Sequence, residues 1–270
     1  MSVLVLPLGL IIGLALGALG GGGSILTVPA LVYALGQDPA TATTSSLLVV
    51  GLSSLIALLP HHRAGRVRLG QGLAFGALGA AGSVVGSTLS ARVAPGVLLS
   101  AFAGLMLVVA VLMLRRSGRS TQASAADVSA EPIVRLRPLA CACPRLVKLL
   151  VTATVVGLLT GFFGVGGGFV LVPALVLALA FPMPVAVGTS LLVIAVNSAT
   201  ALSTRVVSGL AHVDWALIGV FTATTIAGSL VGGRVAQKVQ PRHLSTAFAV
   251  VLVVIAVYTG VRSLAPLLSS

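Results

Sequence analysis

A Gly-rich apolar segment occurs twice in this chain of 270 residues. Residues 13–35 read GLALGALGGGGSILTVPALVYAL, and residues 157–179 read GLLTGFFGVGGGFVLVPALVLAL, with 13 of the 23 positions identical at an offset of 144. Self-similarity at a fixed offset is the mark of an internal repeat. Apolar segments interrupted by glycine at corresponding positions in two halves are typical of the binding region of a transporter.

The composition places this chain in a membrane. Apolar residues make up 57% of it and charged residues only 7%, against about 25% in soluble domains. We therefore expect an all-α, polytopic helical membrane protein that lies in the lipid bilayer. The net charge of +12 comes from basic residues in the short gaps between apolar runs. That distribution is typical of topology signals and speaks against a nucleic-acid partner.

The repeat continues beyond the glycine segment and defines the expected organisation. Gly86 matches Gly232, and Pro95 matches Pro241, both at an offset of 146. We predict two homologous repeats of about four apolar segments each, with Gly-broken first segments. The first transmembrane repeat is expected at residues 1–115, a hydrophilic linker at 116–146 and the second transmembrane repeat at 147–270.

The first apolar segment of each repeat has an unusual length. About 33 residues are too many for one straight span and too few for two complete spans with a turn, since a span needs about 20 residues. Four glycines lie in the middle of each segment, at 20–23 and at 164 with 166–168. Glycine weakens a helix by about 1 kcal/mol per residue relative to alanine. We predict two shorter helices joined by an unwound glycine stretch.

The two halves of such a segment either cross the membrane once or form a re-entrant pair. A single crossing divides the basic residues 12 to 4 and puts both termini and the linker on one side, whereas a re-entrant pair divides them 13 to 3 and puts the linker inside and both termini outside. We favour the re-entrant pair. Its odd number of crossings per half gives inverted repeats, which suit alternating access.

An unwound backbone inside a membrane needs protein or a watery cavity to supply its hydrogen-bond partners. A helix that begins at Ser24 or at Phe169 would aim its free N–H groups and its partial positive charge at the glycine bend, where they could hold an anion. The candidate backbone donors are Gly22, Gly23, Ser24, Gly166, Gly167 and Gly168. The alternative is that these glycines only allow close helix packing, as Gly82 and Gly86 would.

Polar side chains open the next helix of each repeat. Hydroxyl and amide groups can contact an oxyanion at a tolerable cost in lipid, although Ser and Thr also cap helices or bond to their own backbone. The candidate ligands are Thr44, Ser45, Thr189, Ser190 and Asn197. Asn197 is the strongest candidate, because a carboxamide in mid-membrane needs a partner.

Several chemistries are disfavoured by what the sequence lacks. No Asp or Glu lies deep in an expected span, which speaks against a cation pathway. Neither HExxH nor GxSxG occurs, so we expect no enzyme, no catalytic residue and no cofactor. Cys141 and Cys143 lack further ligands nearby and read as a reduced pair rather than a metal site. His61, His62 and His212 could sense pH or guide anions, but such histidines ordinarily contact lipid headgroups.

These motifs together carry a family resemblance. GGGGSILTVPAL and GVGGGFVLVPAL, followed by TSSLLV and GTSLLVIAVNS and then by an AGSxxG helix, resemble the sulfite exporter TauE/SafE family of bacterial membrane permeases. The resemblance implies a multi-pass permease of the bacterial inner membrane that exports small anions such as sulfite or sulfoacetate. An importer or channel for the same anions, a non-transporting scaffold subunit, and assembly into a homo-oligomer stay open.

Overall fold

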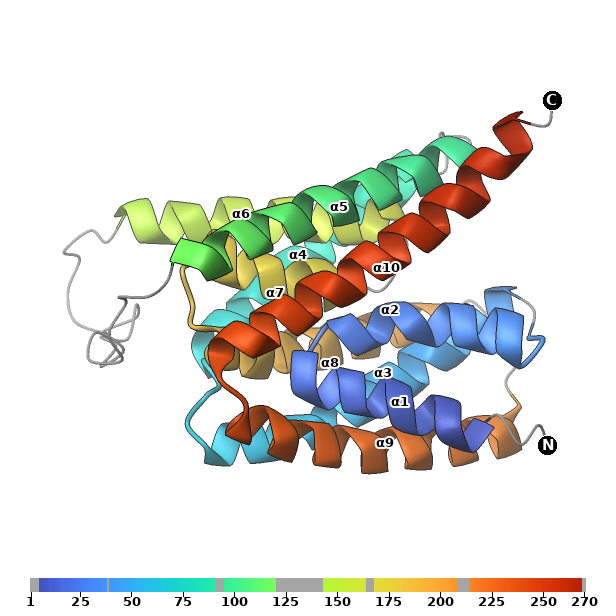
Figure 1. The fold of residues 1–270 in the computed structure, drawn as a ribbon, viewed down its shortest axis with the longest axis horizontal. Coiled ribbons are helices and arrows are strands. Elements are labelled where there is room, and N and C mark those ends of the chain that lie inside the picture. Colours follow the sequence, from blue (N-terminus) through green and yellow to red (C-terminus); the bar gives the residue numbers. More distant parts are fainter. Residues whose placement is uncertain are drawn as a thin grey trace.

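The computed structural model describes residues 5–37, 39–90, 95–119, 143–163, 168–207 and 214–268. Every regular element in these ranges is a helix (Figure 1), which confirms the all-α prediction. The elements are α1 (Val5–Leu19), α2 (Gly22–Pro29), the π-helical turn η1 (Ala30–Ala34), α3 (Pro39–Arg63), α4 (Leu69–Ser90), α5 (Pro95–Arg119), α6 (Cys143–Phe163), α7 (Gly168–Leu177), α8 (Met183–Val207), α9 (Trp215–Lys238) and α10 (Pro241–Leu268).

Five of the described helices contain a stretch long and apolar enough to cross a membrane: α3, α4, α8, α9 and α10. Three helices begin at a proline, since a proline at the first position gives up no helical hydrogen bond. The α9 helix instead begins after Asp214, whose carboxylate accepts from the backbone N–H groups of Ala216 and Leu217 at 3.1 and 3.2 Å. The ends of α5 and α6 extend four residues each into the linker expected at 116–146.

The first apolar segment is broken at the glycines. The α1 helix ends at Leu19, Gly20 adopts a φ of +67°, which favours glycine, and α2 begins at Gly22. The α2 helix therefore starts two residues before the predicted Ser24, and α7 starts at Gly168, one residue before the predicted Phe169. Both glycines predicted as unwound donors in the first half, Gly22 and Gly23, belong to the first helical turn.

The break turns α2 back along α1. The two helices run in opposite directions side by side (Figure 1), and a Cβ atom at Gly23 would lie 2.5 Å from the backbone nitrogen of Leu16. Only a residue without a side chain allows this approach. The pair thus forms the hairpin of the re-entrant prediction in the first half of the chain.

The helix directions follow the re-entrant prediction as well. The α1 helix begins and α10 ends at one end of the molecule, whereas α5 ends and α6 begins at the opposite end (Figure 1). A single crossing by each glycine segment would have put these ends together. Because α1 and α6 run in opposite directions, the two halves have the relative orientation that inverted repeats require.

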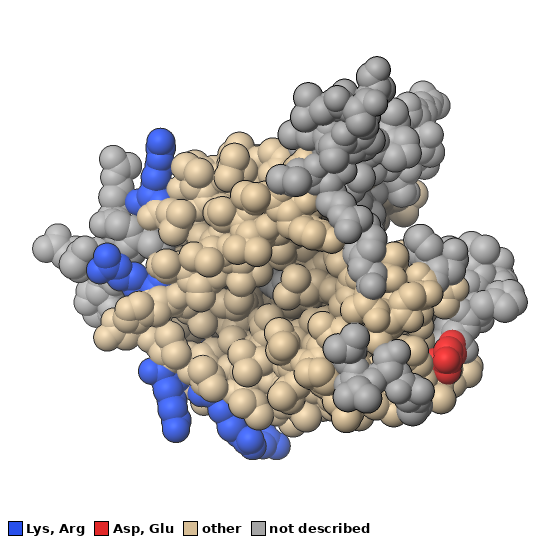
Figure 2. Space-filling model, turned by 45° about the vertical axis from the view of Figure 1, so that its right-hand side comes forward, with Lys and Arg blue, Asp and Glu red and all other residues tan. Residues whose placement is uncertain are grey.

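Basic side chains gather at one end of the molecule. Figure 2 shows the Lys and Arg side chains of this face along one edge, with an acidic side chain at the other edge. The described basic residues at the end where α3 and α9 finish are Arg63, Arg66, Arg68, Arg234, Lys238 and Arg242. Positive residues favour the cytoplasmic side of a membrane, so we expect this end to face the cytoplasm.

Two helix pairs are joined through small residues. The α1 helix packs along α9, and α6 packs along α4. A Cβ atom at Gly232 would overlap the carbonyl oxygen of Leu14, and one at Gly86 would overlap that of Leu158. Leu158 follows Leu14 by 144 residues and Gly232 follows Gly86 by 146, so the same contact occurs in both pairs. Two repeats related by an approximate two-fold axis would make such equivalent contacts.

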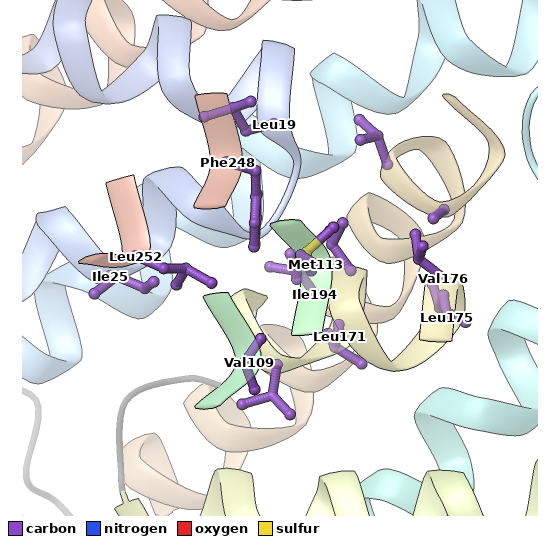
Figure 3. Close-up of a cluster of buried hydrophobic side chains, with 14 of the residues drawn as sticks. Leu19, Ile25, Val109, Met113, Leu171, Leu175, Val176, Ile194, Phe248 and Leu252 are labelled. Carbon is purple, nitrogen blue, oxygen red and sulfur yellow. The ribbon is translucent and has the colours of Figure 1, made fainter. Parts of the chain in front are cut away.

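A cluster of buried apolar side chains lies beside the glycine bend. Leu19 precedes the bend, Ile25 follows it, and both belong to a cluster that includes side chains of α5, α7, α8 and α10; Leu19 lies near Phe248 and Ile25 near Leu252 (Figure 3). Phe248 and Leu252 of α10 are fully buried there. Burial of side chains of this size contributes about 1.5–3 kcal/mol each in water-soluble folds. The bend is therefore held against both halves of the chain.

Candidate functional site

The candidate site lies where the bend of the first half meets the start of α7. A Cβ atom at Gly21 would overlap the carbonyl oxygen of Gly168, and one at Gly168 would lie 3.1 Å from the Cα atom of Gly21. The two backbones are thus in direct contact. Helices α2 and α7, which both begin here, bring the free N–H groups of their first turns to one place.

Two hydroxyls line this contact: that of Ser24, which was predicted as a backbone donor, and that of Ser190, which was predicted as a side-chain ligand. The side chain of Ser24 lies against Gly168, and a Cβ atom at Gly20 would lie 2.6 Å from Oγ of Ser190. Both side chains are buried. Ser24 donates its hydroxyl hydrogen to the carbonyl oxygen of Gly21 at 2.7 Å, and Ser190 donates to that of Val187 at 2.8 Å. Their oxygens keep lone pairs, but donation to an anion requires each hydroxyl to rotate away from its carbonyl.

Thr189 faces a different part of the molecule from its neighbour Ser190. Its Oγ1 accepts a hydrogen bond of 3.2 Å from the backbone N–H of Arg68, in the turn between α3 and α4. Thr44 and Ser45 lie near the start of α3 and are fully buried. The Oγ atom of Ser45 has no hydrogen-bond partner among the described residues. A buried hydroxyl without a partner costs about 1–3 kcal/mol, which a ligand could offset.

Asn197 lies about 10 Å further along α8 than Ser190, because seven residues of helix separate them. Its Oδ1 atom is buried and has no hydrogen-bond partner among the described residues. Cβ atoms at Gly76 and Gly79 would each come within 3.9 Å of its amide group. The carboxamide therefore lies beside the glycine face of α4, away from the contact of Gly21 with Gly168.

The structure brings together Ser24, Gly168 and Ser190 from the predicted set, with Gly22 and Gly23 in the adjoining first turn of α2. Thr189 and Asn197 lie on the side of α8 that faces α4. Gly166 and Gly167 lie outside the described residues. Gly20 and Gly21 belong to the predicted glycine run but not to the predicted site residues. The contact between the two halves of the chain is nevertheless made through them.

His61 was expected to lie at a helix end among lipid headgroups, whereas the structure buries its side chain. Its side chain is 1% exposed, and its Nε2 atom lies 3.3 Å from the carbonyl oxygen of Gly17, one turn before the bend. The adjacent His62 is exposed. Helical periodicity could have separated the two, since His61 follows Ser54 and Ala57 on the buried face of α3.

The electrostatic potential at the site comes from helix dipoles rather than from charged side chains. Helices α1, α2 and α7 carry no charged residue. The first turns of α2 and α7 each contribute a partial positive charge of about half an elementary charge. The site offers hydrogen-bond donors, but among the described residues no three metal-ligating side chains cluster, there or elsewhere.

Comparison with known proteins shows the family to which the chain is related. The profile of the family described as Sulfite exporter TauE/SafE matches residues 5–259. A probable membrane transporter protein of Xylella fastidiosa is 33% identical over 262 residues, which cover 96% of this chain and 95% of that protein. The probable membrane transporter protein YunE of Bacillus subtilis is 29% identical, covering 97% and 99% of the two chains.

A more distant relative is the probable membrane transporter protein MJ0441 of Methanocaldococcus jannaschii, which is 24% identical over 95% of this chain and 96% of its own. No solved structure matches the chain. The profile match spans both glycine segments and every helix that supplies a candidate residue. The chain therefore belongs to the sulfite exporter TauE/SafE family of membrane transporters.

Proposed function

We propose that this chain is a secondary carrier of small sulfur-containing anions, such as sulfite or sulfoacetate, and that it exports them across the bacterial inner membrane. The observation that carries the proposal is the contact of Gly21 with Gly168, where two helix N-termini meet in a region without charged side chains. Backbone N–H groups at helix N-termini favour oxyanions. The description of the matching family supports sulfite as the first anion to test.

Among the residues whose burial the structure describes, no Lys or Arg is buried in the helices that form the site, and this sets the expected affinity. Neutral donors offset only part of the cost of desolvating an anion, so binding should be weak. Weak binding suits a carrier, which must release its cargo. Small tetrahedral or pyramidal oxyanions should be preferred, since the site supplies converging amides and hydroxyls rather than an extended apolar surface.

In this conformation, protein atoms fill the contact of Gly21 with Gly168. An anion can enter this contact only if the backbones of Gly21 and Gly168 move apart. The opposite directions of the two halves support a mechanism in which they rock against each other and open the bend alternately to each side. A tightly packed bend would also suit a non-transporting scaffold subunit, but membership of a transporter family favours the carrier.

Transport by the purified protein in lipid vesicles tests the proposal. Vesicles loaded with sulfite, thiosulfate, sulfoacetate or methanesulfonate should release at least one of these anions faster than protein-free vesicles. Potassium and glycerol should not be released faster. The proposal fails if the protein moves a cation or a neutral solute but none of the sulfur anions.

A matched pair of glycine variants controls for the integrity of the protein. Gly21→Ala should stop release, because the new Cβ atom would overlap Gly168. Gly104→Ala on α5 should transport normally, because a Cβ atom there meets nothing within 4 Å. Equal activity of the two variants would remove the glycine contact from the mechanism.

A further inference from the structure

A buried histidine lies at the end of α1 that adjoins the glycine bend. His61 belongs to the last turn of α3, yet its side chain is only 1% exposed. Its Nε2 atom is 3.3 Å from the carbonyl oxygen of Gly17. A carbonyl oxygen can only accept, so Nε2 carries the hydrogen of the neutral ring. The other ring nitrogen, Nδ1, then holds a lone pair, and it is buried without a hydrogen-bond partner among the described residues.

The break in α1 explains why a donor is needed there. The last four carbonyl oxygens of a helix have no partner within the helix, and Gly17 is among them because α1 ends at Leu19. His61 supplies the partner from α3. The carbonyl end of a helix also carries a partial negative charge, which favours a cation beside it. At the bend, the carbonyl end of α1 therefore lies beside His61, and the amide end of α2 is free to bind an anion.

Three other segments enclose the histidine. Gly233 of α9 lies beside the ring, since a Cβ atom there would be 3.6 Å from Nε2. Gly188 of α8 lies beside its Cβ atom at a corresponding distance of 3.2 Å. The turn after α3 folds back, and the backbone N–H of Arg66 donates to the carbonyl oxygen of His61 at 3.0 Å. His61 thus contacts helices from both halves of the chain.

Among the described residues, the charged side chains that neighbour these contacts in sequence are all basic. Arg66 belongs to the turn after α3 and donates its backbone N–H to His61. Arg68 lies in the same turn, Arg234 follows Gly233 on α9, and His62 and Arg63 end α3. The α1 helix carries no titratable residue, nor does α8 near Gly188. A proton on Nδ1 would therefore be a buried charge among like charges, which is costly until a negative charge arrives.

We propose that Nδ1 of His61 is a proton-binding site coupled to the anion at the glycine bend. This inference rests on the proposed anion transport. An anion at the amide end of α2 stabilises the imidazolium, and the imidazolium strengthens anion binding by the same factor, because coupling between two sites is reciprocal. Each anion then crosses with one proton, taken from water on one side and released on the other. A dianion such as sulfite would cross with one net negative charge, which an interior-negative potential expels.

The test uses the purified full-length protein in vesicles and methanesulfonate, a strong-acid anion that takes up no proton between about pH 5 and pH 8, where histidine titrates. Counterflow of labelled against unlabelled methanesulfonate at equal pH measures transport alone. Accumulation driven by a proton gradient, with a pH dye inside, measures coupling. A gradient of one pH unit should drive about ten-fold accumulation in the wild type, with inward proton movement.

His61→Gln separates the two readouts. The Gln amide can still donate to the carbonyl oxygen of Gly17, but it does not titrate. We expect counterflow to continue with a lower apparent affinity for methanesulfonate, because no imidazolium strengthens anion binding, and we expect gradient-driven accumulation and proton movement to be lost. His62→Gln, which alters the exposed neighbour, should behave like the wild type in both measurements.

If the wild type shows counterflow but no proton movement, the inference is wrong and the proposed function is unaffected. This outcome does not depend on whether His61→Gln folds. Accumulation retained by His61→Gln would overturn the inference as well. Absence of wild-type counterflow for methanesulfonate, sulfite, thiosulfate and sulfoacetate would overturn the proposed function and the inference together.

Discussion

The backbone of Gly21 lies directly against that of Gly168, so the two halves of the chain meet at their glycine breaks. Neither residue tolerates a side chain in this arrangement. The contact joins the first turn of α2 to that of α7, which are the turns with free N–H groups. A movement of one half relative to the other must therefore open or close this point.

The first prediction concerns Gly21. Gly21→Ala should reduce transport at least about ten-fold, because overpacking costs about 1–3 kcal/mol and the clash falls on backbone atoms that cannot rotate away. The measurement is anion release from vesicles with equal amounts of inserted protein. Wild-type release by this variant would show that the bends do not need to meet.

The second prediction concerns the packing of α1 on α9. Gly232→Val should lower the amount of folded protein, because its Cβ atom would overlap the carbonyl oxygen of Leu14. Gly219→Ala lies on the same helix, where a Cβ atom meets nothing within 4 Å, and should be neutral. Thermal stability in detergent checks both variants. If Gly232→Val is as stable as Gly219→Ala, close packing of these helices does not hold the fold together.

The third prediction concerns Asn197. Asn197→Leu should insert normally but transport less, because it removes a carboxamide beside α4 whose NH2 group can donate to an anion that moves along α8 from the glycine contact. Loss of one such interaction is worth about 1–3 kcal/mol, or about ten-fold in transport at the middle of that range. Thr200→Val, on an exposed turn of α8, is the control. Equal initial rates for these two variants would exclude Asn197 from the transport path.

The fourth prediction concerns topology. Cys141 and Cys143 are the only cysteines in the sequence; Cys141 precedes α6, and Cys143 is the first residue of that helix. A membrane-impermeant maleimide should label them only after cells are permeabilised, whereas Ser270→Cys in a chain lacking both should be labelled in intact cells. Labelling of Cys141 and Cys143 from outside, or protection of position 270, would contradict the expectation that the basic end faces the cytoplasm.

The sequence by itself determined the membrane class, the family, the correspondence of the two halves and the position of the first glycine break. These properties follow from local rules. The composition decides whether the chain folds in water or in lipid, and a run of glycines such as Gly20–Gly23 weakens any helix that contains it. Basic residues counted along the chain also predicted the cytoplasmic end, although two topologies differed by a single residue in that count.

Only the tertiary structure gave the helix directions, which favour the re-entrant topology, and selected the residues that meet. The reversal at Gly20 depends on a φ of +67°, which four consecutive glycines leave open among many conformations. Thr189 and Ser190 are neighbours in sequence, yet one faces the turn at Arg68 and the other faces the bend, because successive helical residues point about 100° apart. His61 lies within hydrogen-bond distance of Gly17, 44 residues away in sequence, because α1 ends at Leu19 and the last turn of α3 lies beside that end. Such contacts join segments distant in sequence, and no local pattern encodes them.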